Sequence, residues 1–227
     1  GEMKTMNLPQ IKSKGSLTEK TYNTLKRAIL DLDLEPGKLL TEEELSEQLG
    51  ISRTPLRAAL SKLEYENLIT VIPGRGTYVA ELSIDYMEDI FDVREVVDML
   101  SVKLAAERRT DKDIKEMYFL IEQQEQLLQN KEVDVKQFIK LDIEFHCVIS
   151  RATNNEILKR LTLELVESYN RYILVAPFLD RASTIASEHK QIIEAIKEEN
   201  GEKAAKIVQN HISDIRESLK ERIKKIL

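Results

Sequence analysis

Glycine and proline are unevenly distributed along this 227-residue chain, and this distribution limits its architecture more than any other feature. Six of the seven glycines and four of the five prolines lie before residue 80. Because these residues mark points where a backbone turns, the first third of the chain is predicted to be compact and rich in turns. After Leu82 only Pro177 and Gly201 interrupt the sequence. The rest is therefore predicted to form long amphipathic helices.

The change near residue 80 predicts a mainly α protein of two domains, covering residues 1–82 and 83–227. Residues 1–80 hold 11 Lys+Arg and 11 Asp+Glu, which leaves 23 and 29 for the remainder of a chain whose formal net charge is -6. No apolar run is long enough for a membrane helix, and no signal peptide is recognisable. A single cysteine excludes a disulfide framework. We therefore expect a cytoplasmic protein that has no contact with a membrane.

The first domain has the pattern of a winged helix-turn-helix. Thr41 with Glu44 three residues later predicts a capping box that opens a helix over 42–49, and Gly50 ends it. Ser52 is expected to cap the next helix, over 53–67, which follows a first helix over 17–33. The apolar stretch 68–72, the turn 73–76 and the strand 77–79 are typical of a β-hairpin.

Two arginines at the start of the helix over 53–67 indicate contact with double-stranded DNA. Arg53 and Arg57 are four residues apart and therefore share one helical face. Arginine can bond guanine O6 and N7 with two parallel hydrogen bonds. Ser52 and Thr54 can reach phosphates, and Arg75 at the hairpin tip can reach the backbone or the minor groove. The alternative is an ordinary solvated helix face.

The segments Leu45–Leu60 and Gly74–Val79 resemble the winged helix of the GntR family of bacterial transcription regulators. The resemblance implies base contacts by Arg53 and Arg57, and a wing contact near Arg75 and Gly76. Some members place an arginine in the first turn of the preceding helix, where this chain has Glu42–Glu44. The operator is therefore expected to differ from the operators of those members.

The second domain is predicted to contain six helices, over 84–108, 111–129, 133–152, 156–175, 180–199 and 202–226. Its three histidines, His146, His189 and His211, lie on different helices with apolar neighbours on their faces, so each is expected to point inward. Asp142 shares the face of His146, and no Lys or Arg lies one turn away on that face. Three imidazoles and one carboxylate suit Zn, Ni, Mn or Co. Core histidines bonded to backbone carbonyls are the alternative.

The family resemblance extends into this second domain. Val93–Glu95, Leu104–Arg108, Asp142–His146, Ala152–Asn155, Glu188-His189 and Ala204-Ala205 ahead of His211 resemble the effector-binding FCD domain found in one GntR subfamily. The resemblance implies a divalent metal held by an Asp and three His at the bottom of a helical cavity, which map onto Asp142, His146, His189 and His211. It also implies a small carboxylate effector, and six helices match the shorter, VanR-like branch.

Arg94 is the candidate clamp for the effector carboxylate. Its face neighbours Ile90, Phe91 and Val97 are apolar, so its guanidinium is expected to point into the bundle. Pairing with Asp98, one turn on, is the competing interpretation. Asn170, with Tyr169 and Tyr172, is expected either to line the same cavity or to belong to the core.

The favoured function is a homodimeric, ligand-responsive transcription regulator that reads a pseudo-palindromic operator. An effector would then change operator affinity by roughly 1–3 kcal/mol. One alternative is a metal-dependent hydrolase, since an ion with an open position can activate water. The sequence has no catalytic motif to accompany such an ion, so we do not expect an enzyme. A sensor for which the metal itself is the signal is the third possibility.

Overall fold

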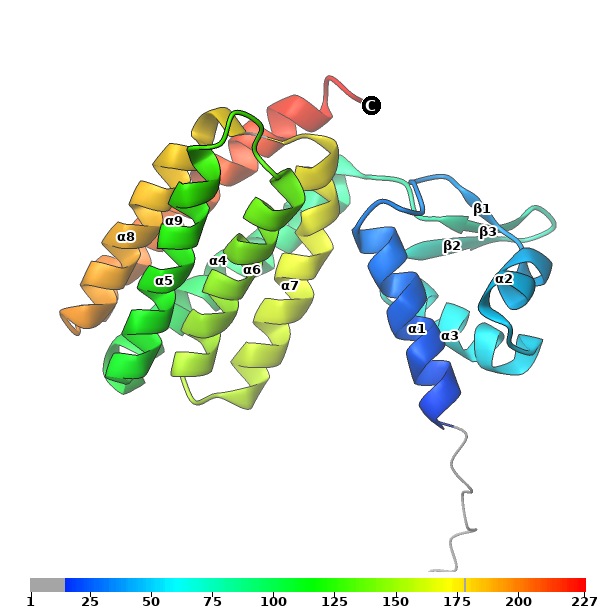
Figure 1. Ribbon diagram of the computed structural model, residues 1–227, viewed down its shortest axis with the longest axis horizontal. Coiled ribbons are helices and arrows are strands. Elements are labelled where there is room, and N and C mark those ends of the chain that lie inside the picture. The colour runs from blue at the N-terminus through cyan, green and yellow to red at the C-terminus, as the bar shows by residue number, and fades with distance from the viewer. Residues whose placement is uncertain (1–14, 178) are drawn as a thin grey trace, which may run out of the picture. The chain divides into compact units, whose positions relative to one another are not determined.

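The computed structural model describes residues 15–177 and 179–227 (Figure 1). Over this range the chain forms nine α-helices, one short 3-10 helix and a three-stranded sheet, which confirms the predicted mainly α class. The chain divides into two compact units. The first ends at Glu81 and the second begins at Leu82, with Leu30–Leu32 grouped with the second. None of the described helices has the length and apolar character needed to cross a membrane.

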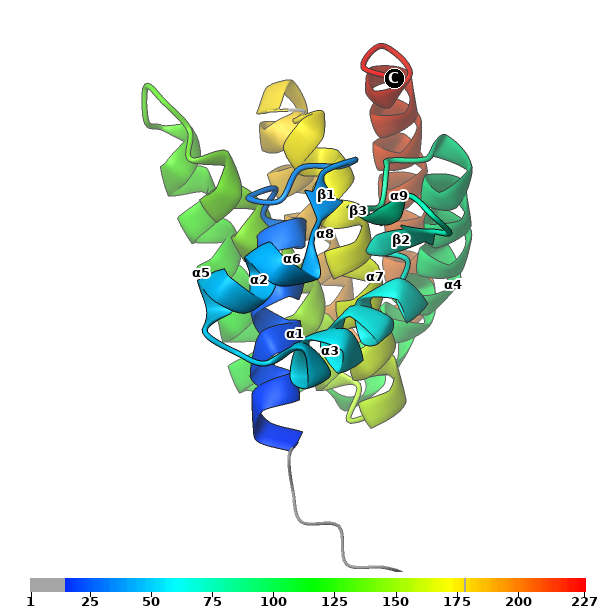
Figure 2. The ribbon, with the colours of Figure 1, turned by 90° about the vertical axis from the view of Figure 1, so that its right-hand side faces the viewer.

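The first unit has the elements of a winged helix-turn-helix, which face the viewer in Figure 2. They are α1 (Gly15–Leu30), β1 (Leu39–Leu40), α2 (Glu42–Leu49), α3 (Arg53–Tyr65), β2 (Ile69–Ile72) and β3 (Gly76–Val79). The strands lie in the order β1-β3-β2 and both pairings are antiparallel. Only β1 was not predicted, because two residues are too few to show an alternating pattern.

Local hydrogen bonds explain where α2 and α3 begin and end, with two differences from the predicted caps. Thr41 Oγ1 accepts from Glu44 N at 3.3 Å, but the Glu44 carboxylate accepts from Gln48 instead of closing a capping box. Gly50 ends α2 in the left-handed region with φ 62°. Ser52 occupies the cap position of α3 without a side-chain hydrogen bond. Pro55, the third residue of α3, has no N–H to donate.

The second unit contains the six predicted helices, which lie side by side in Figure 1. They are α4 (Ile84–Arg108), α5 (Asp111–Leu128), α6 (Val135–Ala152), α7 (Glu156–Val175), α8 (Ala182–Lys197) and α9 (Gly201–Ile223), with a 3-10 helix over Leu179–Arg181 before α8. The bounds differ from the predicted ones by at most three residues. Antiparallel packing of such helices leaves side chains of several helices in one shared interior.

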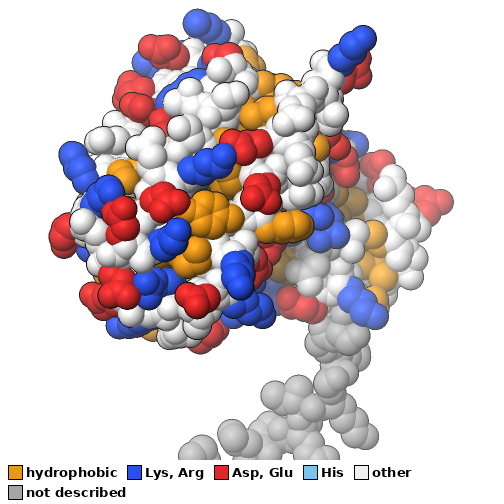
Figure 3. Space-filling model, turned by 60° about the vertical axis from the view of Figure 1, so that its left-hand side comes forward, with side chains coloured by type: hydrophobic (Ala, Val, Ile, Leu, Met, Phe, Trp, Pro, Cys, Tyr) orange, Lys and Arg blue, Asp and Glu red, His pale blue; other side chains and the backbone are white. Residues whose placement is uncertain are grey.

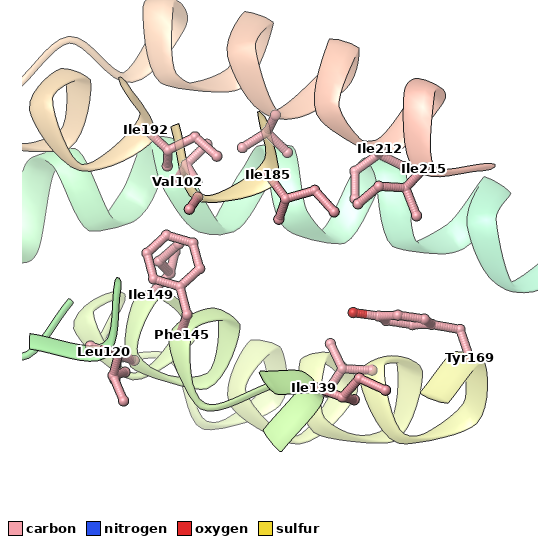
Figure 4. Close-up of a cluster of buried hydrophobic side chains, with 14 of the residues drawn as sticks. Val102, Leu120, Ile139, Phe145, Ile149, Tyr169, Ile185, Ile192, Ile212 and Ile215 are labelled. Atoms are coloured by element: carbon pink, nitrogen blue, oxygen red, sulfur yellow. The ribbon is translucent and has the colours of Figure 1, made fainter. Parts of the chain in front are cut away.

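The interior of the helical unit is an apolar cluster to which every one of its six helices contributes (Figure 4). Phe145 is fully buried in this cluster and stacks on the His189 ring, with 4.2 Å between ring centroids. By contrast, Figure 3 shows a face of the molecule on which acidic and basic side chains are interspersed. Because burial of apolar surface is the main stabilising term, the polar side chains inside this cluster require a separate explanation.

Candidate functional site

The predicted DNA-reading side chains of α3 are all accessible. Ser52, Arg53, Thr54 and Arg57 are exposed, whereas Leu56 on the same helix is fully buried. Apolar contacts therefore fix the inner face of α3 and leave its first two turns facing outward. Thr54 and Ser52 keep their hydroxyls available for phosphate oxygens.

Arg57 also has a partner that the sequence did not reveal. Its Nε donates to both carboxylate oxygens of Glu42 on α2, at 2.8 and 2.9 Å. This hydrogen bond lowers the pKa of Glu42 and raises the pKa of Arg57. The acidic first turn of α2 was visible in the sequence as a departure from some GntR members. Its contact with α3 depends on the angle between the two helices, which no sequence pattern fixes.

The wing places Arg75 at an exposed turn between β2 and β3. Its backbone N donates to Ile72 O at 2.9 Å, and the Tyr78 hydroxyl donates to Arg75 O at 3.2 Å. Gly76 has φ 130°, and a Cβ there would lie 2.9 Å from Leu39 Cδ1. The positive φ favours glycine at this position, whereas the exposed Leu39 side chain could move away from an added Cβ.

The three histidines are buried and converge from α6, α8 and α9. One possible ligand nitrogen from each lies within 4.8 Å of the others, and His189 Nε2 is 3.3 Å from His211 Nε2. Asp142 Oδ1 lies 3.7 Å from His189 Nε2, and Asp142 Oδ2 lies 3.9 Å from His146 Nε2. Ligands about 2 Å from one ion stand roughly 3–3.5 Å apart. The four side chains therefore fit a single divalent ion after small movements.

Two of the imidazoles have a carboxylate behind them. Glu188 Oε2 is 2.6 Å from His211 Nδ1, and Asp98 Oδ2 is 3.8 Å from His146 Nδ1. Burial raises the pKa of Glu188, but the hydrogen bond and charge of His211 outweigh it and leave the pKa lowered. An ionised Glu188 accepts a hydrogen bond from His211 Nδ1, which leaves Nε2 as the His211 atom that lies toward His189. Metal-binding histidines commonly have such a carboxylate partner.

Burial also keeps the other two imidazoles neutral. It is the largest cause that lowers the pKa of His146 and His189 well below the ordinary value, and the charge of Arg94 lowers both further. Neutral imidazole is the form that binds metals. Within the described residues, His189 Nδ1 is a buried atom without a hydrogen-bond partner.

Arg94 lies fully buried in the same cluster. Its contacts bear on both earlier interpretations, a structural pair with Asp98 and a clamp for the effector carboxylate. Its Nε donates to Asp98 Oδ2 at 3.1 Å, which is the structural pairing. Its Nη2 is 3.1 Å from His146 Nε2, and Nη1 has no partner among the described residues. An ion bound to His146 Nε2 would require Arg94 to move. The face of α6 that carries Asp142 has no Lys or Arg, and the cation of this cluster, Arg94, comes from α4 instead. The sequence pattern of α6 alone could not reveal this.

Residues of α7 complete the surroundings of Asp142. The Tyr169 hydroxyl points into the bundle (Figure 4) and donates to Asp142 Oδ2 at 3.2 Å. Asn170 is buried, and its Oδ1 has no partner among the described residues. Tyr172 instead donates to Ser83 O at 3.0 Å and so has a structural role. Asn170 is therefore a buried residue with an unused hydrogen-bond acceptor, and its role in effector binding stays a prediction.

A pocket reaches Asp142 from the surface of the helical unit. Among the described residues, Asp142 is its only ionisable lining residue, and the others are apolar: Val135, Phe138, Ile139, Ile173, Pro177, Leu179, Ile185 and Ile215. The enclosed part measures about 20 Å³, which is room for about one water molecule. Arg94 and Asn170 do not line this pocket in the present structure.

Comparison with known proteins connects both units to transcription regulation. Residues 17–79 match the family of bacterial regulatory proteins named gntR, and residues 89–214 match the FCD domain. The Nta operon transcriptional regulator of Aminobacter aminovorans is 32% identical over 180 residues, with 78% of this chain and 82% of that protein covered. The HTH-type transcriptional regulator YdhC of Bacillus subtilis is 28% identical over 201 residues, covering 88% and 89%.

The solved structure of McbR/YncC from E. coli has the same fold, with a TM-score of 0.78 and 26% identity. The matched region covers 92% of this chain and 99% of the McbR/YncC chain. The relatives are named as transcriptional regulators, which weighs against the hydrolase alternative. This chain therefore belongs to the GntR family of bacterial regulatory proteins, as a DNA-binding transcription regulator that carries an FCD domain and is not an enzyme.

Proposed function

We propose that this protein is a cytoplasmic, homodimeric regulator whose affinity for a pseudo-palindromic operator is set by a small carboxylate bound beside a divalent metal. In this proposal residues 1–82 read DNA and residues 83–227 bind the metal and the acid. Arg53 and Arg57 contact base edges, while Ser52, Thr54, Arg75 and Gly76 contact the backbone of the duplex. The exposure of these side chains on α3 and the wing supports this assignment.

The metal would be held by Asp142, His146, His189 and His211, and the ion is one of Zn, Ni, Mn or Co. The observation that carries this proposal is the convergence of three buried imidazoles, with Asp142 beside His146 and His189, and with Glu188 and Asp98 next to the Nδ1 atoms of His211 and His146. Four protein ligands leave positions on the ion for a carboxylate oxygen. Arg94 and Asn170, each with an unpartnered polar atom among the described residues, would complete the acid site.

A homodimer would present two winged helices to the two halves of the operator. An apolar stripe on the outer side of α4 supports this assembly. Val93, Val96 and Leu100 share one helical face, and they are 51%, 67% and 44% exposed. A two-fold axis beside α4 would bury this stripe against its own copy.

A thermal-shift screen of small carboxylates tests the effector site. We expect at least one acid to raise the melting temperature of the metal-loaded full chain and to have no effect after chelation. Arg94→Lys should reduce this rise, because lysine keeps the charge but loses the planar fork that clamps a carboxylate. Arg108→Lys on the same helix is the control, since Arg108 donates to the Thr153 carbonyl at the far end of α4. Stabilisation that survives both chelation and Arg94→Lys would contradict the proposed site.

A further inference from the structure

We propose that the effector is an acid with one carboxylate and an apolar body. This inference rests on the proposed function and assigns its ligand class. In the part of the chain that the structure describes, the pocket that leads to Asp142 has eight apolar lining residues and no other ionisable one. A ligand whose carboxylate reaches the ion through this pocket must therefore leave its body against aliphatic and aromatic side chains.

The formal charges of the cluster favour a single carboxylate. Arg94, Asp98 and Asp142 together carry one net negative charge, and all three are buried. A divalent ion changes this sum to one positive charge, which one carboxylate neutralises. A second carboxylate in the same interior would be a buried charge without a partner, which is strongly unfavourable. Glu188 is left out of this sum because it is partly exposed and lies 3.7 Å from Arg181, which also pairs with Asp214.

The ion also explains how an anion can approach Asp142. Without the ion, an incoming carboxylate would meet the carboxylate of Asp142 at the end of the pocket. With the ion, both carboxylates could bind one cation, and Arg94, whose Nη1 has no partner among the described residues and whose Nη2 lies 3.1 Å from His146 Nε2, would move to donate to the acid. Binding of the acid is therefore expected to require the metal.

The small size of the enclosed space disfavours a hydroxylated body. Its volume of about 20 Å³ means that wall side chains must move to admit an acyl chain. Methylene groups restore apolar contacts to the displaced side chains, whereas hydroxyl groups would lose hydrogen bonds to water and find few partners here. The pocket should therefore discriminate among acids of the same length by the polarity of their bodies.

Four six-carbon compounds test this inference by thermal shift on the zinc-loaded full chain: hexanoate, adipate, gluconate and hexan-1-ol. Hexanoate is expected to raise the melting temperature the most, and chelation should abolish its effect. Val135→Ser, in the pocket wall, should weaken the hexanoate effect. Val133→Ser is the matched control, because Val133 is a half-buried residue outside the pocket.

Equal or greater stabilisation by gluconate or adipate would overturn the apolar monoacid while leaving a carboxylate site intact. A full effect of hexan-1-ol would show that the carboxylate is not needed. If none of the acids stabilises the loaded protein, the effector site of the proposed function itself is wrong.

Independently, the geometry of α2 and α3 points to Glu42 as a residue that positions Arg57 for reading a base. The contact uses only Nε of Arg57, so that both Nη groups remain without a partner among the described residues. These two groups form the fork that matches guanine O6 and N7. Glu42 thereby holds a long exposed side chain in one orientation before DNA arrives, and its charge weakens attraction to phosphates of any sequence.

A duplex library with a randomised centre tests the role of Glu42, with the full chain as the selecting protein. Glu42→Ala and Glu43→Ala remove the same charge from the same helical turn, and Glu43 is an exposed residue outside this contact. Both variants should bind random duplex more tightly than the unaltered protein. Only Glu42→Ala should lower the preference for the selected duplex, by about two- to fivefold.

Equal preference in the two variants would overturn the positioning role of Glu42. Failure of the unaltered protein to enrich any sequence would instead refute the proposed reading of an operator. The two outcomes are therefore distinguishable within one experiment.

Discussion

Arg57→Ala is expected to remove most of the preference for the operator over random DNA, by roughly ten- to a hundredfold. Alanine cannot supply the two hydrogen bonds that Arg57 would make to a guanine, and Arg53, the other exposed arginine on that face of α3, would already be engaged with its own base. Affinities measured for the selected duplex and for random duplex at several salt concentrations check this result. Binding to both should weaken steeply with salt, because phosphate neutralisation releases counterions.

Two further variants make the Arg57→Ala result specific. Arg75→Ala at the wing should weaken binding to both duplexes by a similar factor, as expected of a backbone contact. Lys112→Ala removes the same charge from an exposed position on α5 in the helical unit and should change neither affinity. If Arg57→Ala weakened both duplexes equally, Arg57 would be a phosphate contact and the base-reading assignment would be wrong.

Removal of the bound metal is expected to lower the melting temperature of the helical unit by about 10 °C. An ion present at a thousand times its dissociation constant stabilises the folded state by roughly 4 kcal/mol, and each kcal/mol corresponds to about 2–4 °C for a domain of this size. Elemental analysis of untreated protein followed by calorimetry before and after chelation checks both the occupancy and the shift.

In variants, the quantity to compare is the difference in melting temperature between metal-loaded and chelated protein. Substitutions inside the bundle alter the melting temperature by themselves, so a single value would not isolate the effect of the metal. Asp142→Asn and His189→Gln should abolish this difference. Asp98→Asn removes the carboxylate that faces His146 Nδ1 and Arg94 but keeps all four proposed ligands, so the difference should shrink without disappearing. Metal-free untreated protein whose melting temperature does not respond to added metal would contradict the site.

Local signals in the sequence were sufficient for most of the fold. Glycine at position 50, the cap at Thr41 and the apolar spacing of the later helices predicted the element bounds to within a few residues, since each depends on neighbours along the chain. The inward direction of His146, His189 and His211 followed from the same helical periodicity, and their burial confirms it. The convergence of their ring nitrogens was implied only by the family resemblance.

Contacts between helices could not be predicted in the same way. Glu42 with Arg57, Glu188 with His211, and Arg94 with His146 each join side chains on different helices, whose rotation and crossing angle come from the packing of the whole unit. Arg94 illustrates the consequence. Its pairing with Asp98 was visible at a spacing of four residues, but its contact with an imidazole 52 positions away was not.

The centre of the helical unit brings together the buried side chains of one arginine, two aspartates and three histidines: Arg94, Asp98, Asp142, His146, His189 and His211. Aliphatic residues of similar size would commonly stabilise such a core more than charged ones do. Chains that lack an ion would therefore unfold more often and be degraded faster by cellular proteases. The abundance of this regulator in a bacterium would then follow the supply of its metal, so that scarcity of the ion alters gene expression by depleting the protein.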